Sequence, residues 1–153
     1  KYALDFSSTD SVVECVLNDE MKKNKIYDYL CIIEPTSPLR SKESLKKAYK
    51  FLQKKKTNTL ITVNLFTNYY GYIKNKRFIY ISDKFLPRQK RKKIFIETGT
   101  FYFVETNFFL KNKKIRSKNP SYIEVPKSEI IDINDYEDIK IAETLIKSKV
   151  NKK

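Results

Sequence analysis

The sequence predicts an α/β fold in which parallel strands are joined by a helix. An apolar, β-rich run at 29–33 precedes an amphipathic helical pattern at about 41–54, and a second β-rich run follows at 58–64. Strand, helix and strand in this order imply a right-handed parallel crossover. The length of 153 residues suits one domain, and a 41% apolar content is enough for its core. We therefore expect a single domain over 1–153.

The first predicted element is a helix, because the first ten residues show no strand pattern. Ser8 or Ser11 can cap this helix, and Ser11 with Glu14 could form a capping box. Its apolar face is formed by Val12, Val13, Val16 and Leu17. The polar segment 18–25 is expected to end the helix.

A stiff polar link joins the first predicted strand to the helix at 41–54. It reads Glu34-Pro35-Thr36-Ser37-Pro38-Leu39-Arg40, and its two prolines fix φ at two points. In open α/β sheets, ligands bind beyond the carboxyl ends of the strands, which makes this link a candidate site. The alternative is a proline-braced connection before a helix capped by Ser41.

The pattern changes after the second strand. Two short β-like runs, 69–73 and 78–81, flank Lys74-Asn75-Lys76 and predict a hairpin. The segment 85–93 is loop-like and ends in the basic cluster Arg88-Gln89-Lys90-Arg91-Lys92-Lys93.

The last part of the chain returns to alternating strands and helices. We expect a strand at 100–104, a short helix at 106–110, a strand at 122–125 and a final helix from 135 to about 149. The final helix has an apolar face of Ile139, Ala142, Leu145 and Ile146. Asp135 can cap it, with Asp138 as the reciprocal partner, and the Lys-rich end is expected to fray.

The composition excludes several kinds of chemistry. The chain has no His, which rules out Ser/His/Asp triads, Cys/His dyads and ordinary zinc sites. Cys15 and Cys31 lie in apolar surroundings without CxxC spacing, so we expect two buried, unpaired thiols. A metal site would have to consist of oxygen ligands, which suits Mg²⁺. No run reaches transmembrane length and no targeting segment is recognisable, so a cytoplasmic protein is the default expectation.

The net charge of +14 leaves two interpretations open. A basic protein can bind nucleic acid or small polyanions, and the cluster at 88–93 with nearby aromatic residues could stack bases. The Lys residues are also scattered over polar helix faces, and Lys, Asn, Ile and Tyr are all abundant, as a compositionally biased genome would give. No nucleic-acid-binding motif supports the first interpretation.

Three polar clusters could carry chemistry. They are 34–40, Arg88-Gln89 with Glu97-Thr98-Gly99, and 131–138. In the third cluster, Asp132 and Asn134 are two apart, so on an extended segment both oxygens point to one face and could hold Mg²⁺. Helix capping is the alternative for this cluster. Gly99 could serve a positive φ, a close ligand or a plain turn.

Taken in order, these clusters resemble the acylneuraminate cytidylyltransferase (CMP-sialic acid synthetase) family. The family's Gln-Pro-Thr-Ser-Pro-Leu-Arg motif is similar to 34–40, and its Arg-Gln loop and Thr-Gly before a Tyr-containing strand match Arg88-Gln89 and 98–102. Its Ile-Asp-Ile-Asp ending resembles 131–138 followed by Ala142-Glu143. The resemblance covers nearly the whole chain.

The resemblance implies a three-layer α/β/α sandwich with a mainly parallel sheet, like other nucleotide-diphospho-sugar transferases. It implies CMP transfer from CTP to a sialic or related nonulosonic acid, an acidic nine-carbon sugar. It also implies a homodimer, with 64–91 as the dimerisation excursion. Asp132 and Asn134 would hold Mg²⁺, and Arg88 would act in catalysis beside Asp132. The substrate-binding residues would be Glu34, Thr36, Ser37, Arg40, Gln89, Thr98 and Gly99.

Three departures from the family pattern modify this expectation. The chain resembles the C-terminal two-thirds of the family, and its two Gly residues cannot build the family's Gly-rich phosphate loop. Glu34 stands where the family has Gln, and Asn134 stands where it has Asp. Alternative functions are therefore a non-catalytic remnant, a sugar-binding fragment of this fold or a basic nucleic-acid-binding domain.

Overall fold

The computed structural model describes residues 8–82 and 84–150 and has the expected α/β architecture. The helices are α1 (Thr9–Lys22), α2 (Lys42–Lys54), α3 (Thr106–Asn112) and α4 (Tyr136–Val150). The strands are β1 (Tyr29–Ile32), β2 (Thr59–Phe66), β3 (Gly71–Lys74), β4 (Arg77–Tyr80), β5 (Ile94–Glu105) and β6 (Ser121–Glu124). Two short 3₁₀ helices cover Arg88–Lys90 and Lys127–Glu129.

The central sheet has the strand order β1-β5-β2-β6. β5 is antiparallel to both β1 and β2, and β2 is parallel to β6, so β1, β2 and β6 run in one direction. The predicted crossover from β1 through α2 to a parallel β2 is therefore confirmed. β5 lies between these two strands, so the crossover passes over a strand that comes later in the sequence.

Helices cover both faces of this sheet, which gives the three layers. On one face, α2 packs Ala48 and Leu52 against Leu60, Phe101 and Ile123. On the other face, Leu17 of α1 and Phe109 of α3 pack against Val104 of β5. Phe101 and Val104 serve opposite faces because they are an odd number of residues apart on one strand.

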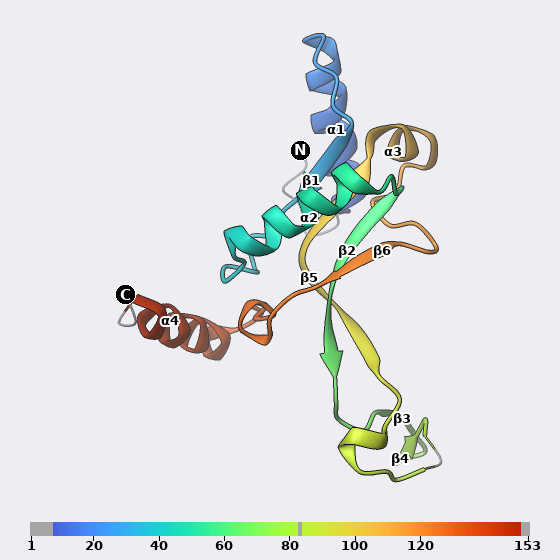
Figure 1. The fold of residues 1–153 in the computed structure, drawn as a ribbon, viewed down its shortest axis with the longest axis vertical. Helices are drawn as coiled ribbons and strands as arrows, with labels where there is room; N and C mark the ends of the chain where they lie inside the picture. Colours follow the sequence, from blue (N-terminus) through green and yellow to red (C-terminus); the bar gives the residue numbers. More distant parts are fainter. Residues whose placement is uncertain (1–7, 83, 151–153) are drawn as a thin grey trace.

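Beyond the sheet, β2 and β5 continue as a two-stranded arm that ends in a small lobe with β3 and β4 (Figure 1). Within the described residues, the lobe consists of 67–82 and 84–93 and is separate from the helical layers. Asn75 and Lys76 both have positive φ, as a two-residue hairpin turn requires. The predicted hairpin is thus confirmed, and the arm explains why its sequence departs from the α/β pattern.

Several predicted helices and strands end or begin at other residues in the structure. Ser8, not Ser11, caps α1, since its side chain accepts the N–H of Ser11 at 3.2 Å. The helix continues through the polar segment to Lys22, because a helix needs only one apolar face. β5 begins at Ile94, six residues before the predicted start, since its first part forms the arm. The expectations for the first seven residues and for the last three lie outside the described residues.

Burial also differs from expectation in two places. Cys15 is half-buried and Cys31 is exposed, so the prediction of two buried thiols was wrong, although both are unpaired as predicted. On α4, Ala142 is 3% exposed while Ile139 and Ile146 are 38% and 45% exposed, so the predicted apolar face is only partly buried. Among the described residues, no helix is both long and apolar enough to cross a membrane.

Candidate functional site

The link at 34–40 leaves β1 at the carboxyl end of that strand, and Arg40 holds it in shape. The Arg40 Nη1 atom donates to the main-chain oxygens of Glu34 and Ser37, each at 2.8 Å. It also lies 3.4 Å from the main-chain oxygen of Thr100 on β5. The guanidinium therefore folds the link on itself and fixes it to the sheet, so Arg40 acts first as a structural residue.

The link brings together side chains with different access to a ligand. Thr36 is exposed and Glu34 is half-buried, whereas Ser37 is only 2% exposed. The Glu34 carboxylate has no hydrogen-bond or ion-pair partner within 8–82 and 84–150. Of the predicted substrate residues on this link, Glu34 and Thr36 are thus best placed to meet a ligand.

Thr98 and Gly99 lie beside the link, where the pairing of β2 and β5 is irregular. The register shifts between Ile61 and Val63, and Gly99 has a φ of +67°. A Cβ atom on Gly99 would lie 3.3 Å from the Tyr102 hydroxyl, so both backbone strain and a close contact favour glycine there. The Thr98 hydroxyl bonds those of Thr62 and Thr100 at 2.9 and 3.0 Å, and so points into the sheet network.

The loop that follows β6 meets the link after β1. Ile133 donates its main-chain N–H to the main-chain oxygen of Thr36 at 2.8 Å. Asp132 and Asn134 flank Ile133 and are exposed, and the Asn134 amide lies 3.4 Å from the Asp132 carboxylate. The structure therefore brings the first and third predicted clusters together, as the site requires.

The donor set at Asp132 and Asn134 fits a weakly held Mg²⁺. It offers one carboxylate and one side-chain amide. The Asn134 Nδ2 atom donates to the Asp132 carboxylate at 3.4 Å, so the amide must turn over for its oxygen to share an ion with Asp132. Mg²⁺ in phosphate-transferring sites takes few protein ligands and completes its shell with water and phosphate. Within the described part of the chain, no three His, Cys, Asp or Glu side chains converge as a metal cage. Asp135 and Asp138 are capping residues as predicted, since they accept main-chain N–H groups at the start of α4.

A polar group near the same end of β1 joins Glu97, which belongs to the second predicted cluster, to Arg116, which was not predicted. Arg116 donates to Glu97 at 2.8 Å and to the Tyr102 hydroxyl at 2.7 Å. Burial raises the pKa of Tyr102 to about 12; Arg116 opposes this rise, whereas the Glu97 and Glu34 carboxylates add to it. Arg116 lies in a loop of scattered basic residues, so the sequence carried no signal that singled it out.

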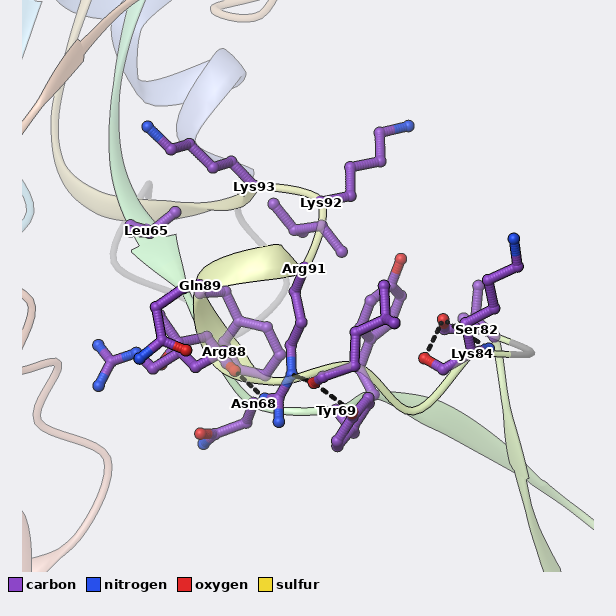
Figure 2. Close-up of a pocket in the computed structure, with 16 residues that line it drawn as sticks. Leu65, Asn68, Tyr69, Ser82, Lys84, Arg88, Gln89, Arg91, Lys92 and Lys93 are labelled. Atoms are coloured by element: carbon purple, nitrogen blue, oxygen red, sulfur yellow. Dashed lines mark hydrogen bonds between the residues drawn. The ribbon is translucent and has the colours of Figure 1, made fainter.

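Arg88 and Gln89 lie in the lobe, away from the Asp132 loop (Figure 1). They line a cavity of about 800 Å³ together with Asn68 and Tyr69. Figure 2 shows Arg91 directed at Tyr69, and its guanidinium lies 3.9 Å from the ring centroid. One chain therefore brings Thr98 and Gly99 of the second predicted cluster beside the link but leaves Arg88 and Gln89 in the lobe.

The basic cluster of the lobe offers fewer free cations than its sequence suggests. Arg91 donates to the main-chain oxygens of Leu86 and Thr67 at 2.7 and 2.8 Å, so its guanidinium is engaged within the lobe. Lys92 and Lys93 extend away from Arg91 (Figure 2).

Known proteins are similar to this chain over most of its length. The chain is 26% identical over 149 residues to a pseudaminic acid cytidylyltransferase of Campylobacter jejuni serotype O:2, covering 94% of this chain and 64% of the relative. It is 27% identical over 144 residues to the post-translational flagellin modification protein B of Campylobacter coli, covering 88% and 61%. The chain thus spans less than two thirds of the length of these relatives. No protein-family model matches it.

Solved structures show the same fold. The 2-C-methyl-D-erythritol 4-phosphate cytidylyltransferase of Francisella tularensis superposes with a TM-score of 0.63 at 12% identity, covering 94% of this chain and 68% of that one. The 4-diphosphocytidyl-2C-methyl-D-erythritol synthase of Anaerococcus prevotii gives 0.58 at 15% identity, covering 92% and 67%. The chain therefore shares the fold of these two solved structures. The predicted resemblance is confirmed: over nearly its whole length the chain is similar to pseudaminic acid cytidylyltransferases, which are CMP-nonulosonic acid synthetases.

Proposed function

We propose that this chain forms the sugar- and metal-binding part of a cytidylyltransferase that transfers CMP from CTP to a nonulosonic acid. The observation that carries this proposal is the contact between Ile133 and Thr36, which joins the two motif-bearing loops at the carboxyl end of β1. Pseudaminic acid is the first candidate substrate, because two of the similar proteins are named for it.

The proposed reaction joins the anomeric hydroxyl oxygen of the sugar to the α-phosphorus of CTP. The bond from that phosphorus to the bridging oxygen of the pyrophosphate breaks, pyrophosphate leaves, and the hydroxyl proton passes to solvent. Asp132 and Asn134 would hold Mg²⁺, which neutralises phosphate charge when bound. The chain supplies mainly positioning, because phosphoryl-type transfer depends on alignment and charge neutralisation.

On the sugar side, Glu34 and Thr36 are the side chains closest to a ligand entering beside the link. Arg40 would act by holding the main chain of this link, and Gly99 by leaving room at the Tyr102 hydroxyl. Arg116, which is exposed, extends this surface with a cationic donor.

We further propose that the protein is a homodimer formed through the lobe. Apolar side chains exposed on this lobe include Tyr72, Ile73, Phe78, Tyr80, Ile81 and Phe85. Exposed apolar side chains gathered in one region are typical of interaction surfaces. Within one chain, Arg88 and Gln89 lie away from the Asp132 loop. In a dimer, Arg88 and Gln89 of the second copy would be candidates to complete that site.

The decisive test is product formation by the protein expressed from its complete reading frame. With CTP, Mg²⁺ and pseudaminic acid, we expect equal amounts of CMP-sugar and pyrophosphate, followed by phosphorus NMR. If CTP stays intact with pseudaminic, sialic and related nonulosonic acids, and none of these sugars binds, the proposal is wrong.

A second candidate is a sugar-binding protein of this fold that has lost transfer activity. The departures at Glu34 and Asn134 favour it, since they add a carboxylate at the sugar side and remove one at the metal site. This candidate predicts saturable sugar binding by calorimetry without pyrophosphate release, so the same assay separates the two.

A further inference from the structure

Glu129 is the one carboxylate in the described part of the chain whose residue is fully buried. Its side chain is 2% exposed, and the Ser44 hydroxyl donates to its Oε1 atom at 3.0 Å. The Thr100 hydroxyl lies 3.4 Å from its main-chain oxygen. The second carboxylate oxygen, Oε2, is buried and has no hydrogen-bond partner.

The position of Glu129 connects three parts of the candidate site. It ends the short 3₁₀ helix after β6, three residues before Asp132. Its partner Ser44 lies in the first turn of α2, which directly follows the link at 34–40. Its other partner, Thr100, is the residue of β5 whose main-chain oxygen faces Arg40.

These contacts continue as a chain of hydroxyl groups through the sheet. The Thr98 hydroxyl forms hydrogen bonds with the hydroxyls of Thr100 and Thr62. On the other side, the Ser41 hydroxyl donates to the Ser44 hydroxyl at 3.3 Å. Glu129 is the only member of this chain that lies on the same loop as Asp132. It therefore links the Asp132 loop to the rest of the network.

A buried carboxylate with one side-chain hydrogen bond is an unfavourable choice for stability alone. Burying an ionised group costs free energy unless both oxygens are paired, and an apolar side chain of similar volume often stabilises a fold at least as well. The presence of Glu129 at this position therefore points to a requirement for a hydrogen-bond acceptor where its Oε1 atom lies.

We propose that Glu129 is a positioning residue that holds the Asp132 loop against the link at 34–40. It does so by accepting the hydroxyl of Ser44 on α2, the helix that directly follows the link, while the contact from Ile133 to Thr36 ties the same loop to the link itself. What Asp132 then does for the reaction rests on the proposed function; the tie itself does not.

The proposal makes a specific demand on the chemistry at this position. Only an acceptor at Oε1 is required, so Gln in place of Glu129 should preserve the tie, and Ala should break it. If Glu129 acted through its charge instead, by binding a cation or moving a proton, Gln would be as damaging as Ala.

The test compares Glu129→Ala, Glu129→Gln and, as a matched control, Glu124→Ala. Glu124 and Glu129 both line a cavity of about 370 Å³, but Glu124 is exposed and its carboxylate does not accept the Ser44 hydroxyl. In Glu129→Ala the hydrogen bond from Ser44 is lost, so the loop should open more often and the Ile133 amide should exchange with deuterium about tenfold faster. In Glu129→Gln and Glu124→Ala we expect exchange at the wild-type rate.

In the transfer assay, Glu129→Ala should raise the Mg²⁺ concentration for half-maximal rate about tenfold, as loss of outer-shell support typically does. The Michaelis constant for CTP should stay near the wild-type value, and Glu129→Gln should behave as wild type. If Glu129→Ala does not fold, Ser44→Ala removes the same hydrogen bond from the donor side and is expected to give the same changes.

Two results would overturn the proposal: unchanged Ile133 exchange in both Glu129→Ala and Ser44→Ala, or a Gln variant as impaired as the Ala variant. The exchange measurement needs no turnover. Faster exchange in a protein that makes no CMP-sugar would therefore refute the proposed function and leave the positioning role standing.

Discussion

Ile133 donates its main-chain N–H to the main-chain oxygen of Thr36 at 2.8 Å, and this bond joins the loops that follow β1 and β6. The two strands are the outer strands of the central sheet, so their loops can meet only by crossing the β5–β2 pair. A main-chain bond sets the loop spacing independently of side-chain identity. Glu34 and Asn134, which depart from the family pattern of Gln and Asp, can therefore change the chemistry of the site without changing its backbone framework.

Replacing Arg40 by Lys is expected to lower stability more than ligand affinity. Arg40 reaches three main-chain oxygens through its Nη1 atom, and the shorter Lys side chain would end one bond before that position. The free energy of unfolding should fall by about 2 kcal/mol, the range for hydrogen bonds from a charged group. Urea unfolding measures this loss, and Lys42→Arg on the exposed start of α2 serves as the control.

An unchanged unfolding free energy together with loss of sugar binding would assign Arg40 to the ligand instead. That outcome would restore the role that the sequence predicted for it.

Glu34→Gln is expected to strengthen binding of an acidic sugar. The Glu34 carboxylate has no partner among the described residues, and a like charge about 4 Å away costs about 1 kcal/mol in water and more near a protein surface. We expect the dissociation constant to fall about fivefold or more, measured by calorimetry in low salt. Glu43→Gln, on an exposed turn of α2, should leave the constant unchanged.

If sugar affinity and preference are the same in Glu34→Gln and the wild type, Glu34 neither weakens acidic-sugar binding nor marks another substrate. Tighter binding of a sugar that carries an amino group by wild type than by Glu34→Gln would instead support a cationic substrate.

Asn134→Asp is expected to raise the stabilisation that Mg²⁺ gives. The Asn134 amide lies 3.4 Å from the Asp132 carboxylate, so a second carboxylate there adds a charged ligand at the same place. Without metal, the two like charges should lower the melting temperature slightly. With Mg²⁺ the increase in melting temperature should exceed that of the wild type, and Asp132→Asn should show none. An equal increase in all three proteins would place Mg²⁺ elsewhere.

The sequence predicted local structure well where the apolar period and the capping chemistry agreed. The α2 helix, with Ser41 as its cap and Ala48 and Leu52 on its inner face, is an example. The lobe hairpin is another, since Asn75 in a short polar turn between β-rich runs is a strong local signal.

What the sequence could not predict was set by contacts between distant segments. The first half of β5 has a partner only because β2 extends beyond the sheet, so the sequence pattern alone predicted this strand only from residue 100. The family resemblance assigned Arg40 to the substrate, whereas its partners in the structure are main-chain oxygens, which no sequence pattern displays. The buried side chain of Glu129 depends on Ser44, and nothing in either local sequence indicates this pairing.

Ile73→Asp in the lobe is expected to dissociate the proposed homodimer. Ile73 is 69% exposed and lies on β3 among the other exposed apolar residues of the lobe. A charge buried in an apolar interface without a partner is strongly unfavourable, so the dimer should weaken at least tenfold. Sedimentation equilibrium measures the association. Lys74→Asp, on the neighbouring exposed position, is the control for the added charge.

The melting temperature of an Ile73→Asp monomer should stay near that of wild-type monomer, because an exposed side chain contributes little to the core. A wild-type protein that sediments as a monomer at all concentrations would exclude the dimer itself.

Tyr102 is expected to make the protein lose stability as the pH rises from about 10 to about 12. Burial raises the pKa of Tyr102 from its ordinary value of 10.0 to about 12, partly offset by Arg116. Below pH 10.0 both the folded and the unfolded chain hold the phenol proton, so the contribution of this residue is fully present. Between the two values the unfolded chain ionises while folded Tyr102 stays protonated, which favours unfolding.

Tyr102→Phe should therefore flatten this part of the stability curve, measured by urea unfolding at a series of pH values. The variant also loses the 2.7 Å bond from Arg116, so it starts from a lower stability near neutral pH, and the slopes rather than the absolute values must be compared. Tyr122 is 57% exposed, and Tyr122→Phe should keep the wild-type slope, which controls for the general effect of removing one phenol. Equal slopes in the wild type and Tyr102→Phe would mean that the Tyr102 hydroxyl reaches solvent, and that the Arg116–Tyr102 pair opens readily in solution.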